Sequence, residues 1–120
     1  AEISTKEELE LYVTKAGPRP VVIDWYMTHC GPCKRVAPEI ERLSKKYAGK
    51  AMFFKINNSR CPPGLLRQHN IRGFPTFSFF HRGKKVLQFS GADARRVEAT
   101  VDSLLEGKAV GNGGANGGNP

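Results

Sequence analysis

Hydrophobic residues recur with helical spacing in the first part of the chain. Ser4 and Glu7 stand three residues apart, the spacing of a capping box, and predict the start of a helix that ends before Gly17. The apolar residues that follow share one face of this helix: Leu9, Val13 and Ala16. We therefore expect one short amphipathic helix here.

Two uninterrupted apolar runs predict buried strands. Residues 21–27, VVIDWYM, are rich in β-branched and aromatic side chains, and residues 51–56, AMFFKI, form a second such run. The first run contains a single charge, Asp24. A charge in a core strand is costly unless it is paired or serves a function, so Asp24 requires an explanation.

Helical spacing returns after each of these runs. Residues 33–48 place their apolar side chains at helical intervals, with charged residues between them, and residues 64–70 predict a shorter helix. The apolar positions of the longer helix are Val36, Ile40, Leu43 and Tyr47.

The last third of the sequence predicts a hairpin and a final helix. Residues 76–81 and 86–90 read as strands joined by the turn 82–85, and Asp93 can cap the helix that follows. The apolar positions of this helix are Val97, Val101, Leu104 and Leu105. The order of elements predicts an α/β fold with a central mixed β-sheet flanked by helices on both faces.

Composition is that of an ordinary globular domain. The chain has 120 residues, of which 39% are hydrophobic and 25% charged, enough for one core but not for two. We expect one domain over residues 1–106, and we expect the protein to be a monomer. The segment 107–120 is rich in glycine and asparagine and predicts a flexible tail or linker.

Charge and hydropathy argue against two classes of partner. The net charge is +8, but the basic residues are spread along the chain and form no block, so we expect no nucleic acid and favour acidic protein partners. No apolar run approaches the length of a membrane span, so we expect no membrane. The polar, acidic N-terminus is unlike a signal peptide, so we expect a cytoplasmic protein unless a presequence was removed before Ala1.

The stretch HCGPCK carries the candidate chemistry. Cys30 and Cys33 flank the start of a predicted helix, whose N-terminal N–H groups would lower the pKa of Cys30 and make it the attacking thiolate. Cys33, one turn on, is expected to be more buried and able to close a disulfide. Gly31 and Pro32 suit the tight turn and the first turn of the helix.

A zinc half-site is the alternative interpretation of this cysteine pair. Zinc needs about four nitrogen or sulfur ligands, and the remaining candidates, Cys61, His69 and His81, show no suitable spacing. The sequence therefore predicts no metal site. An odd number of cysteines, two of them close together, favours a reducing compartment.

Three stretches together resemble the thioredoxin family: WYMTHCGPCKRVAP, IRGFPTFSFFHRGKKV and FSGADARRVEATVDSLL. The likeness runs from the first helix to Leu105 and implies a thioredoxin fold. It also implies that Asp24 is the buried carboxylate behind the cysteines, with its pKa raised by desolvation so that it exchanges a proton with Cys33. The family also has a lysine at the position of Lys55. A core acid satisfied by this lysine is the other interpretation of Asp24, and the two interpretations do not exclude each other.

The resemblance further implies a substrate groove around Pro75. In the family this proline follows a cis peptide bond and packs against the disulfide, which leaves backbone at Phe74 and Thr76 for an extended substrate peptide. Gly73 and Gly91 would keep the groove open, although either could be a plain turn glycine.

Two positions depart from the family pattern. Tyr26 and His29 stand where the family usually has tryptophan, and both would face substrate. His29 is either an exposed replacement or a cation that favours the Cys30 thiolate below neutral pH. Cys61 is expected on the surface, away from the cysteine pair, as a silent thiol.

The resemblance implies a reductase of protein disulfides. Its partners would be disulfide-containing proteins and a thioredoxin reductase that supplies electrons from NADPH, so no cofactor would be bound beyond the redox-active disulfide of Cys30 and Cys33. The alternative is an interaction module of a multidomain protein that docks partners in the groove at Pro75.

Overall fold

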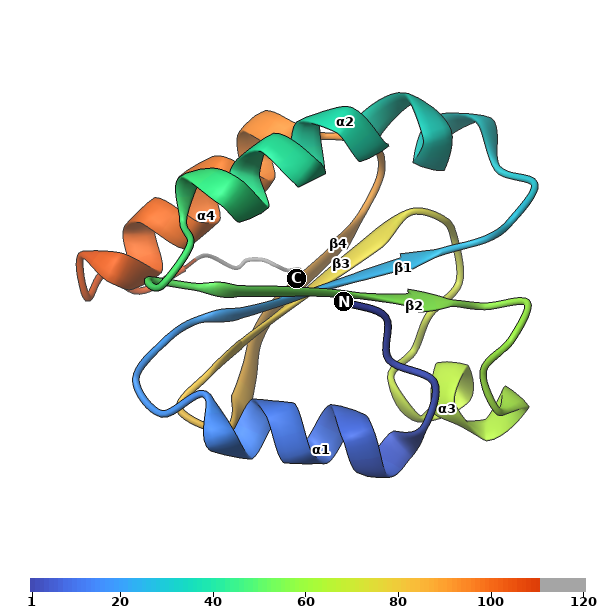
Figure 1. Cartoon of the computed structure of the whole chain (residues 1–120), viewed down its shortest axis with the longest axis horizontal. Coiled ribbons are helices and arrows are strands. Elements are labelled where there is room, and N and C mark those ends of the chain that lie inside the picture. The colour runs from blue at the N-terminus through green and yellow to red at the C-terminus, as the bar shows by residue number, and fades with distance from the viewer. Residues whose placement is uncertain (111–120) are drawn as a thin grey trace.

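The computed structural model describes residues 1–110 and contains four helices and four strands in this part of the chain (Figure 1). In chain order these are α1 (Lys6–Lys15), β1 (Val21–Tyr26), α2 (Gly31–Lys46), β2 (Met52–Asn57), α3 (Pro63–Gln68), β3 (Thr76–His81), β4 (Lys84–Ser90) and α4 (Ala94–Leu105). The predicted order of elements is confirmed.

The strands form one mixed sheet with the order β2-β1-β3-β4. β1 and β2 are parallel, whereas β1 with β3 and β3 with β4 are antiparallel. β3 and β4 are joined by a tight turn in which Arg82 and Gly83 both have positive φ, 55° and 83°. Positive φ at both central residues is typical of the two-residue turns found in β-hairpins. The expected mixed sheet and its hairpin are therefore present.

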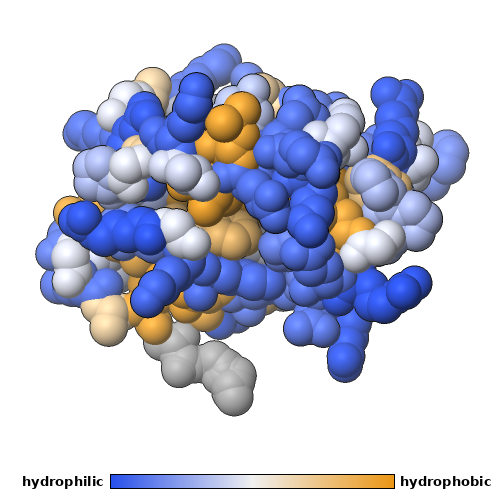
Figure 2. Space-filling model, turned by 90° about the horizontal axis from the view of Figure 1, so that it is seen from below, coloured by the Kyte–Doolittle hydropathy of each residue, from blue (hydrophilic) through white to orange (hydrophobic). Residues whose placement is uncertain are grey.

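Helices cover both faces of the sheet. α2 and α4 lie above it and α1 and α3 below it in Figure 1. Because side chains alternate along a strand, β1 supplies both layers: Val22 packs with α2 and α4, while Val21, Ile23 and Trp25 pack with α1 and α3. The outside of the lower layer is mostly hydrophilic, with hydrophobic side chains visible only between polar ones (Figure 2).

The N-cap of α1 lies one residue later than predicted. Thr5 is the N-cap, with its hydroxyl accepting from the N–H of Glu8, and the Glu8 carboxylate accepts from the N–H of Thr5. Ser4 and Glu7 have the same spacing, but the chain enters the helix one residue later. The predicted cap at Asp93 of α4 is confirmed, since its carboxylate accepts from the N–H of Arg96.

α2 begins at Gly31 rather than at Cys33, because Cys30 itself is the N-cap. The helix continues through Pro38 to Lys46. Its first turn therefore contains both residues between the cysteines, and its apolar face is buried on the sheet through Val36 and Leu43.

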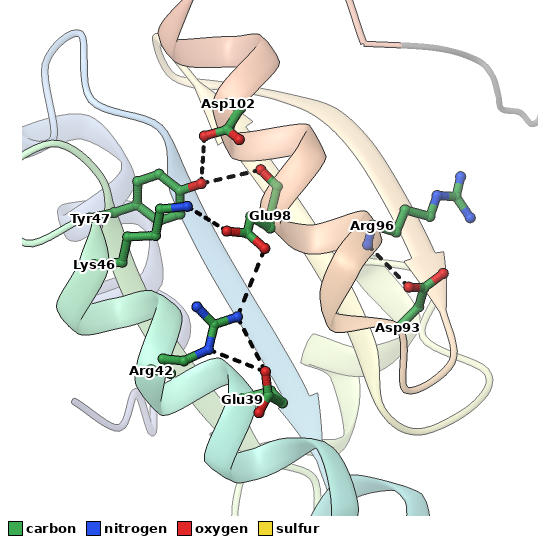
Figure 3. A network of polar contacts seen from close by, with 8 residues as sticks. All are labelled: Glu39, Arg42, Lys46, Tyr47, Asp93, Arg96, Glu98 and Asp102. Atoms are coloured by element: carbon green, nitrogen blue, oxygen red, sulfur yellow. Dashed lines mark hydrogen bonds and ion pairs between the residues drawn. The ribbon is translucent and has the colours of Figure 1, made fainter.

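Polar contacts join α2 to α4 along their outer side (Figure 3). Glu98 of α4 pairs with Arg42 and Lys46 of α2. The Tyr47 hydroxyl, at the end of α2, donates to the carboxylate of Asp102. These contacts fix the helix that carries the cysteines to a neighbour whose own apolar face is buried.

A chain of hydrogen bonds, buried at Trp25 and partly buried beyond Ser78, supports β1 from its lower face. The Trp25 indole N–H donates to the Ser78 hydroxyl at 3.0 Å, which donates to the Gln88 side-chain oxygen at 2.6 Å. The Gln88 amide then donates to the carbonyl of His69 at 2.9 Å. Three strands and the end of α3 are thereby connected on the face of the sheet opposite to Asp24.

Beyond α4, Val110 packs against the upper core layer. The remainder of the predicted tail, 111–120, lies outside the described residues.

Among residues 1–110, no helix combines the length and the apolar character that a membrane crossing requires.

Replacement of Ser78 by alanine tests the buried hydrogen-bond chain. It leaves the Trp25 indole N–H, which is fully buried, without a partner, so we expect the free energy of unfolding to fall by about 1 to 3 kcal/mol. Urea unfolding of Ser78→Ala against wild type measures this. Ser44→Ala, whose hydroxyl bonds only within α2, is the control and should stay within about 0.5 kcal/mol of wild type.

Candidate active site

Cys30 and Cys33 form a disulfide at the N-terminus of α2, with their Cα atoms 5.3 Å apart. The Cys33 backbone N–H donates to the Cys30 sulfur at 3.2 Å, so that sulfur serves as the cap of the helix. Cys30 is partly exposed, whereas Cys33 is only 7% exposed. Cys33 is thus the more buried of the two cysteines, as predicted.

Asp24 faces the underside of α2. It lies two residues from Val22, which packs in the upper layer, and strand alternation turns both side chains to the same face of β1. Asp24 and Cys33 line the same pocket. The single charge in the first apolar run is therefore directed toward the pair of cysteines.

The Asp24 carboxyl group is buried and incompletely paired. It is 8% exposed, and its Oδ1 atom has no hydrogen-bond partner within the described part of the chain. Burial raises the pKa of Asp24 from 3.8 to about 7, although the positive charge of Lys55 lowers it in part. The group can therefore gain and lose a proton near neutral pH.

Lys55 does not satisfy this carboxylate. The two residues are direct neighbours in the register of β1 and β2, yet no ion pair or hydrogen bond joins them in residues 1–110, and Lys55 is exposed. Its ammonium group lies 5.5 Å from the centre of the Tyr26 ring instead. Lys55 therefore acts on Asp24 through its charge rather than through a direct contact, and partial compensation of the acid by this lysine does not exclude the catalytic role.

A pocket of about 300 Å³ opens beside the disulfide and brings together residues that are far apart in the sequence. Of the predicted site residues it contains Asp24, Tyr26, Cys33 and Lys55. Their common location follows from topology, because the carboxyl ends of the parallel strands β1 and β2 meet at the edge where α2 begins.

The predicted groove residues form a second group at the same edge of the sheet. The bond between Phe74 and Pro75 is cis, as the family resemblance implied. β3 starts directly afterwards, and its first residue, Thr76, pairs with Trp25 of β1. The antiparallel pairing therefore places this turn beside the end of β1, from which the chain continues to the cysteines.

Phe74 and Thr76 differ in what they can offer a peptide. Thr76 is buried, has strand neighbours on both sides, and its hydroxyl contacts the Gly73 carbonyl and the Ser90 hydroxyl. Phe74 precedes the strand, and within residues 1–110 its backbone makes no hydrogen bond. Phe74 is thus the residue with unused backbone groups, and Thr76 supports the turn.

The two glycines of this group have different requirements. Gly91 has φ of +114°, which only glycine adopts easily, and its N–H donates to the carbonyl of Pro75 at 2.9 Å. A Cβ at Gly73 would stand 3.8 Å from the Ser90 hydroxyl, an ordinary contact. Gly91 is therefore needed for the local backbone, whereas space alone does not require glycine at Gly73.

The two departures from the family pattern lie in different surroundings. Tyr26 is partly buried, and its hydroxyl donates to the Glu2 carboxylate at 3.2 Å. His29 is exposed and makes no hydrogen bond or ion pair in the described region. Its influence on Cys30 stays a prediction.

Cys61 and the histidines do not gather into a metal site. Cys61 is half-buried against the lower core layer rather than on the open surface, and burial raises the pKa of its thiol. His69 packs between Trp25 and Phe80. Within residues 1–110, no three histidine, cysteine or acidic side chains cluster closely enough to hold a metal ion.

Sequence reasoning missed several pocket residues. Lys34, Asn57 and Arg60 line the pocket, with the Asn57 amide donating to the Thr28 hydroxyl at 3.2 Å. Position along the chain was a signal for both residues, because Asn57 ends β2 and Arg60 follows it, and this strand was expected to run parallel to β1. The side-chain direction of Arg60 depends on the loop after β2, which no sequence pattern specified.

Comparison with known proteins gives a consistent result. A family model described as Thioredoxin matches residues 1–103. Thioredoxins of Ovis aries and Homo sapiens are both 35% identical to this chain over 104 residues, which is 87% of this chain and 97% of each relative. The crystal structure of Fasciola hepatica thioredoxin superposes with a TM-score of 0.81 at 28% identity, covering 86% of this chain and 97% of that one.

The raised pKa of Asp24 predicts a specific dependence of stability on pH. The folded state keeps the proton of Asp24 up to pH about 7, whereas the unfolded chain loses it near pH 3.8. The contribution of Asp24 to the free energy of unfolding is therefore most favourable below pH 3.8, and it falls as the pH rises toward 7. The total loss is about 4 kcal/mol at most, since one pKa unit corresponds to about 1.4 kcal/mol.

Asp24→Asn should remove this loss. We expect the oxidised variant to be more stable than wild type at pH 8, by a few kcal/mol, with the two proteins converging at low pH. Urea unfolding of both proteins between pH 4 and 8 checks this. Parallel stability curves for the two proteins would show that the carboxyl group does not titrate as described.

Proposed function

The chain belongs to the thioredoxin family, and from this premise we propose that it reduces protein disulfides by cycling Cys30 and Cys33 between dithiol and disulfide. The observation that carries the proposal is the Cys30–Cys33 disulfide at the start of α2, above an incompletely paired, buried Asp24. A partly exposed cysteine can attack a substrate disulfide, a covered cysteine can resolve the mixed disulfide, and a titratable acid can take up the proton of the resolving thiol.

In the first step the Cys30 thiolate attacks one sulfur of a substrate disulfide. The Cys33 N–H that points at the Cys30 sulfur, together with the other free N–H groups of the helix terminus, favours the thiolate. A new bond forms between Cys30 and the substrate, and the second substrate sulfur leaves as a thiolate that takes up a proton.

In the second step Cys33 resolves this mixed disulfide. Asp24, in its ionised form, accepts the proton of the Cys33 thiol, and the shared pocket has room for a water molecule that relays it. The Cys33 thiolate then attacks the Cys30 sulfur, the Cys30–Cys33 bond forms, and the first substrate sulfur is released. Two electrons pass from the protein dithiol to the substrate.

The turn at Pro75 would hold the substrate in place. An extended peptide pairs with the unused backbone of Phe74, while Thr76 and Gly91 maintain the turn and Gly73 leaves space beside it. Tyr26 and His29 flank the cysteines and contact the substrate in place of the family's tryptophans.

We assign the reducing direction from the Gly31–Pro32 dipeptide, which in the family accompanies a reducing potential. A thioredoxin reductase would return the disulfide to the dithiol with electrons from NADPH, so the chain itself needs no bound cofactor. The protein would work as a monomer in a reducing compartment such as the cytoplasm.

Two cysteine variants test the proposal. With dithiothreitol as electron donor, Cys30→Ser should abolish the protein-catalysed reduction of a protein disulfide. Reduced Cys33→Ser, mixed with the substrate after dithiothreitol has been removed, should accumulate a mixed disulfide that is visible by mass spectrometry. Equal rates for wild type and Cys30→Ser would instead indicate a binding module. The potential of the pair should lie near the thioredoxin value, about −270 mV, whereas a value near −120 mV would reverse the direction.

The role of His29 is tested by titration. If its imidazolium favours the thiolate, the pKa of Cys30 in the reduced protein should rise in His29→Ala, because a neighbouring cation is lost. The ultraviolet absorbance of the thiolate follows this ionisation. Identical titration curves would leave His29 as an exposed replacement only.

A further inference from the structure

The pocket beside the disulfide is lined by basic side chains. Lys34 comes from α2, Lys55 from β2, and Arg60 from the loop after β2. They surround the same space of about 300 Å³ from three segments of the chain. Cys33 belongs to its lining as well, so the cationic space adjoins the redox centre.

These cations are not neutralised by the protein. In residues 1–110, none of the three takes part in an ion pair or donates a side-chain hydrogen bond; Lys55 only faces the Tyr26 ring. Two other basic residues of the same helix α2 differ in this respect, since Arg42 and Lys46 both pair with Glu98. The positive charges at the pocket are therefore available to a ligand.

Acidic groups near the pocket do not cancel this charge. Asp24 forms part of the lining, but it is buried and stays partly protonated near neutral pH because its pKa is about 7. Glu2 lies nearby and accepts a hydrogen bond from the Tyr26 hydroxyl at 3.2 Å, but it is not part of the lining. The lining thus has an excess of positive charge, with one incompletely paired acid at its base.

We propose that this pocket receives an acidic side chain of the substrate protein, so that the chain prefers disulfides flanked by aspartate or glutamate. The inference rests on the proposed function, because the pocket shares Cys33 with the redox pair. A substrate attached through a sulfur to Cys30 has its neighbouring residues within reach of this space, since the two cysteine Cα atoms are only 5.3 Å apart. Lys34, Lys55 and Arg60 would hold the carboxylate.

Two synthetic peptides test this preference. Both contain the same disulfide, flanked by glutamate in one and by glutamine in the other, and dithiothreitol regenerates the protein. We expect kcat/KM to be about three- to tenfold higher for the glutamate peptide, the range for a few partly exposed charge pairs. Lys34→Gln and Arg60→Gln should each reduce this ratio about twofold or more, and the double variant should bring it close to one.

Arg35→Gln is the matched control. Arg35 follows Lys34 in α2, is exposed, and does not line the pocket. Its guanidinium stands 3.3 Å from where a Cβ at Gly31 would lie, so it is near the cysteines too. Loss of its charge should leave the glutamate-to-glutamine ratio unchanged.

The possible outcomes separate this inference from the proposed function. Equal reduction of both peptides by wild type, or the same fall of the ratio in Arg35→Gln as in Lys34→Gln, would overturn the pocket preference while leaving the reductase intact. Reduction of neither peptide would overturn the proposed function and the preference together.

Discussion

A carboxyl group buried in the central strand with incomplete hydrogen bonding is the constraint on which the site depends. Desolvation of a charged carboxylate is unfavourable, and the chain accommodates it by raising the pKa of Asp24 to about 7 rather than by supplying a partner for Oδ1. The alternation of β1 then decides its use. The same strand that turns Trp25 into the lower core turns Asp24 toward α2 and Cys33.

Such a destabilising group is tolerated because the structure around it is firmly packed on both faces. Below the sheet, Trp25 is held by the buried hydrogen bond to Ser78. Above it, α2 is fixed to α4 through Glu98 and through the hydrogen bond from Tyr47 to Asp102. Core packing can outweigh an unfavourable interaction at one position, which is typical of sites where charge serves chemistry.

Much of the fold and the chemistry could be predicted because the decisive signals are local. A charge within an apolar run marked Asp24, and two cysteines at the start of a helical pattern marked the redox pair. The cap of α1 could not be placed to the residue, since Ser4–Glu7 and Thr5–Glu8 have equal spacing and only the path into the helix selects one. The separation of Lys55 from Asp24 likewise depends on side-chain direction, although strand register made them neighbours. The part that Arg60 plays in the pocket escaped prediction because this residue lies in a loop without periodicity.

The two sides of the disulfide differ in what they can recognise. At the Pro75 turn, the unused groups belong to the backbone of Phe74, and backbone pairing accepts almost any extended sequence. At the opposite flank, next to Cys33, the available groups are the side chains of Lys34 and Arg60, which respond to the charge of whatever approaches. Under the proposed function, the turn therefore supplies affinity for a peptide in general. Discrimination between substrates must then come from the side-chain flank, because backbone hydrogen bonds carry little information about sequence.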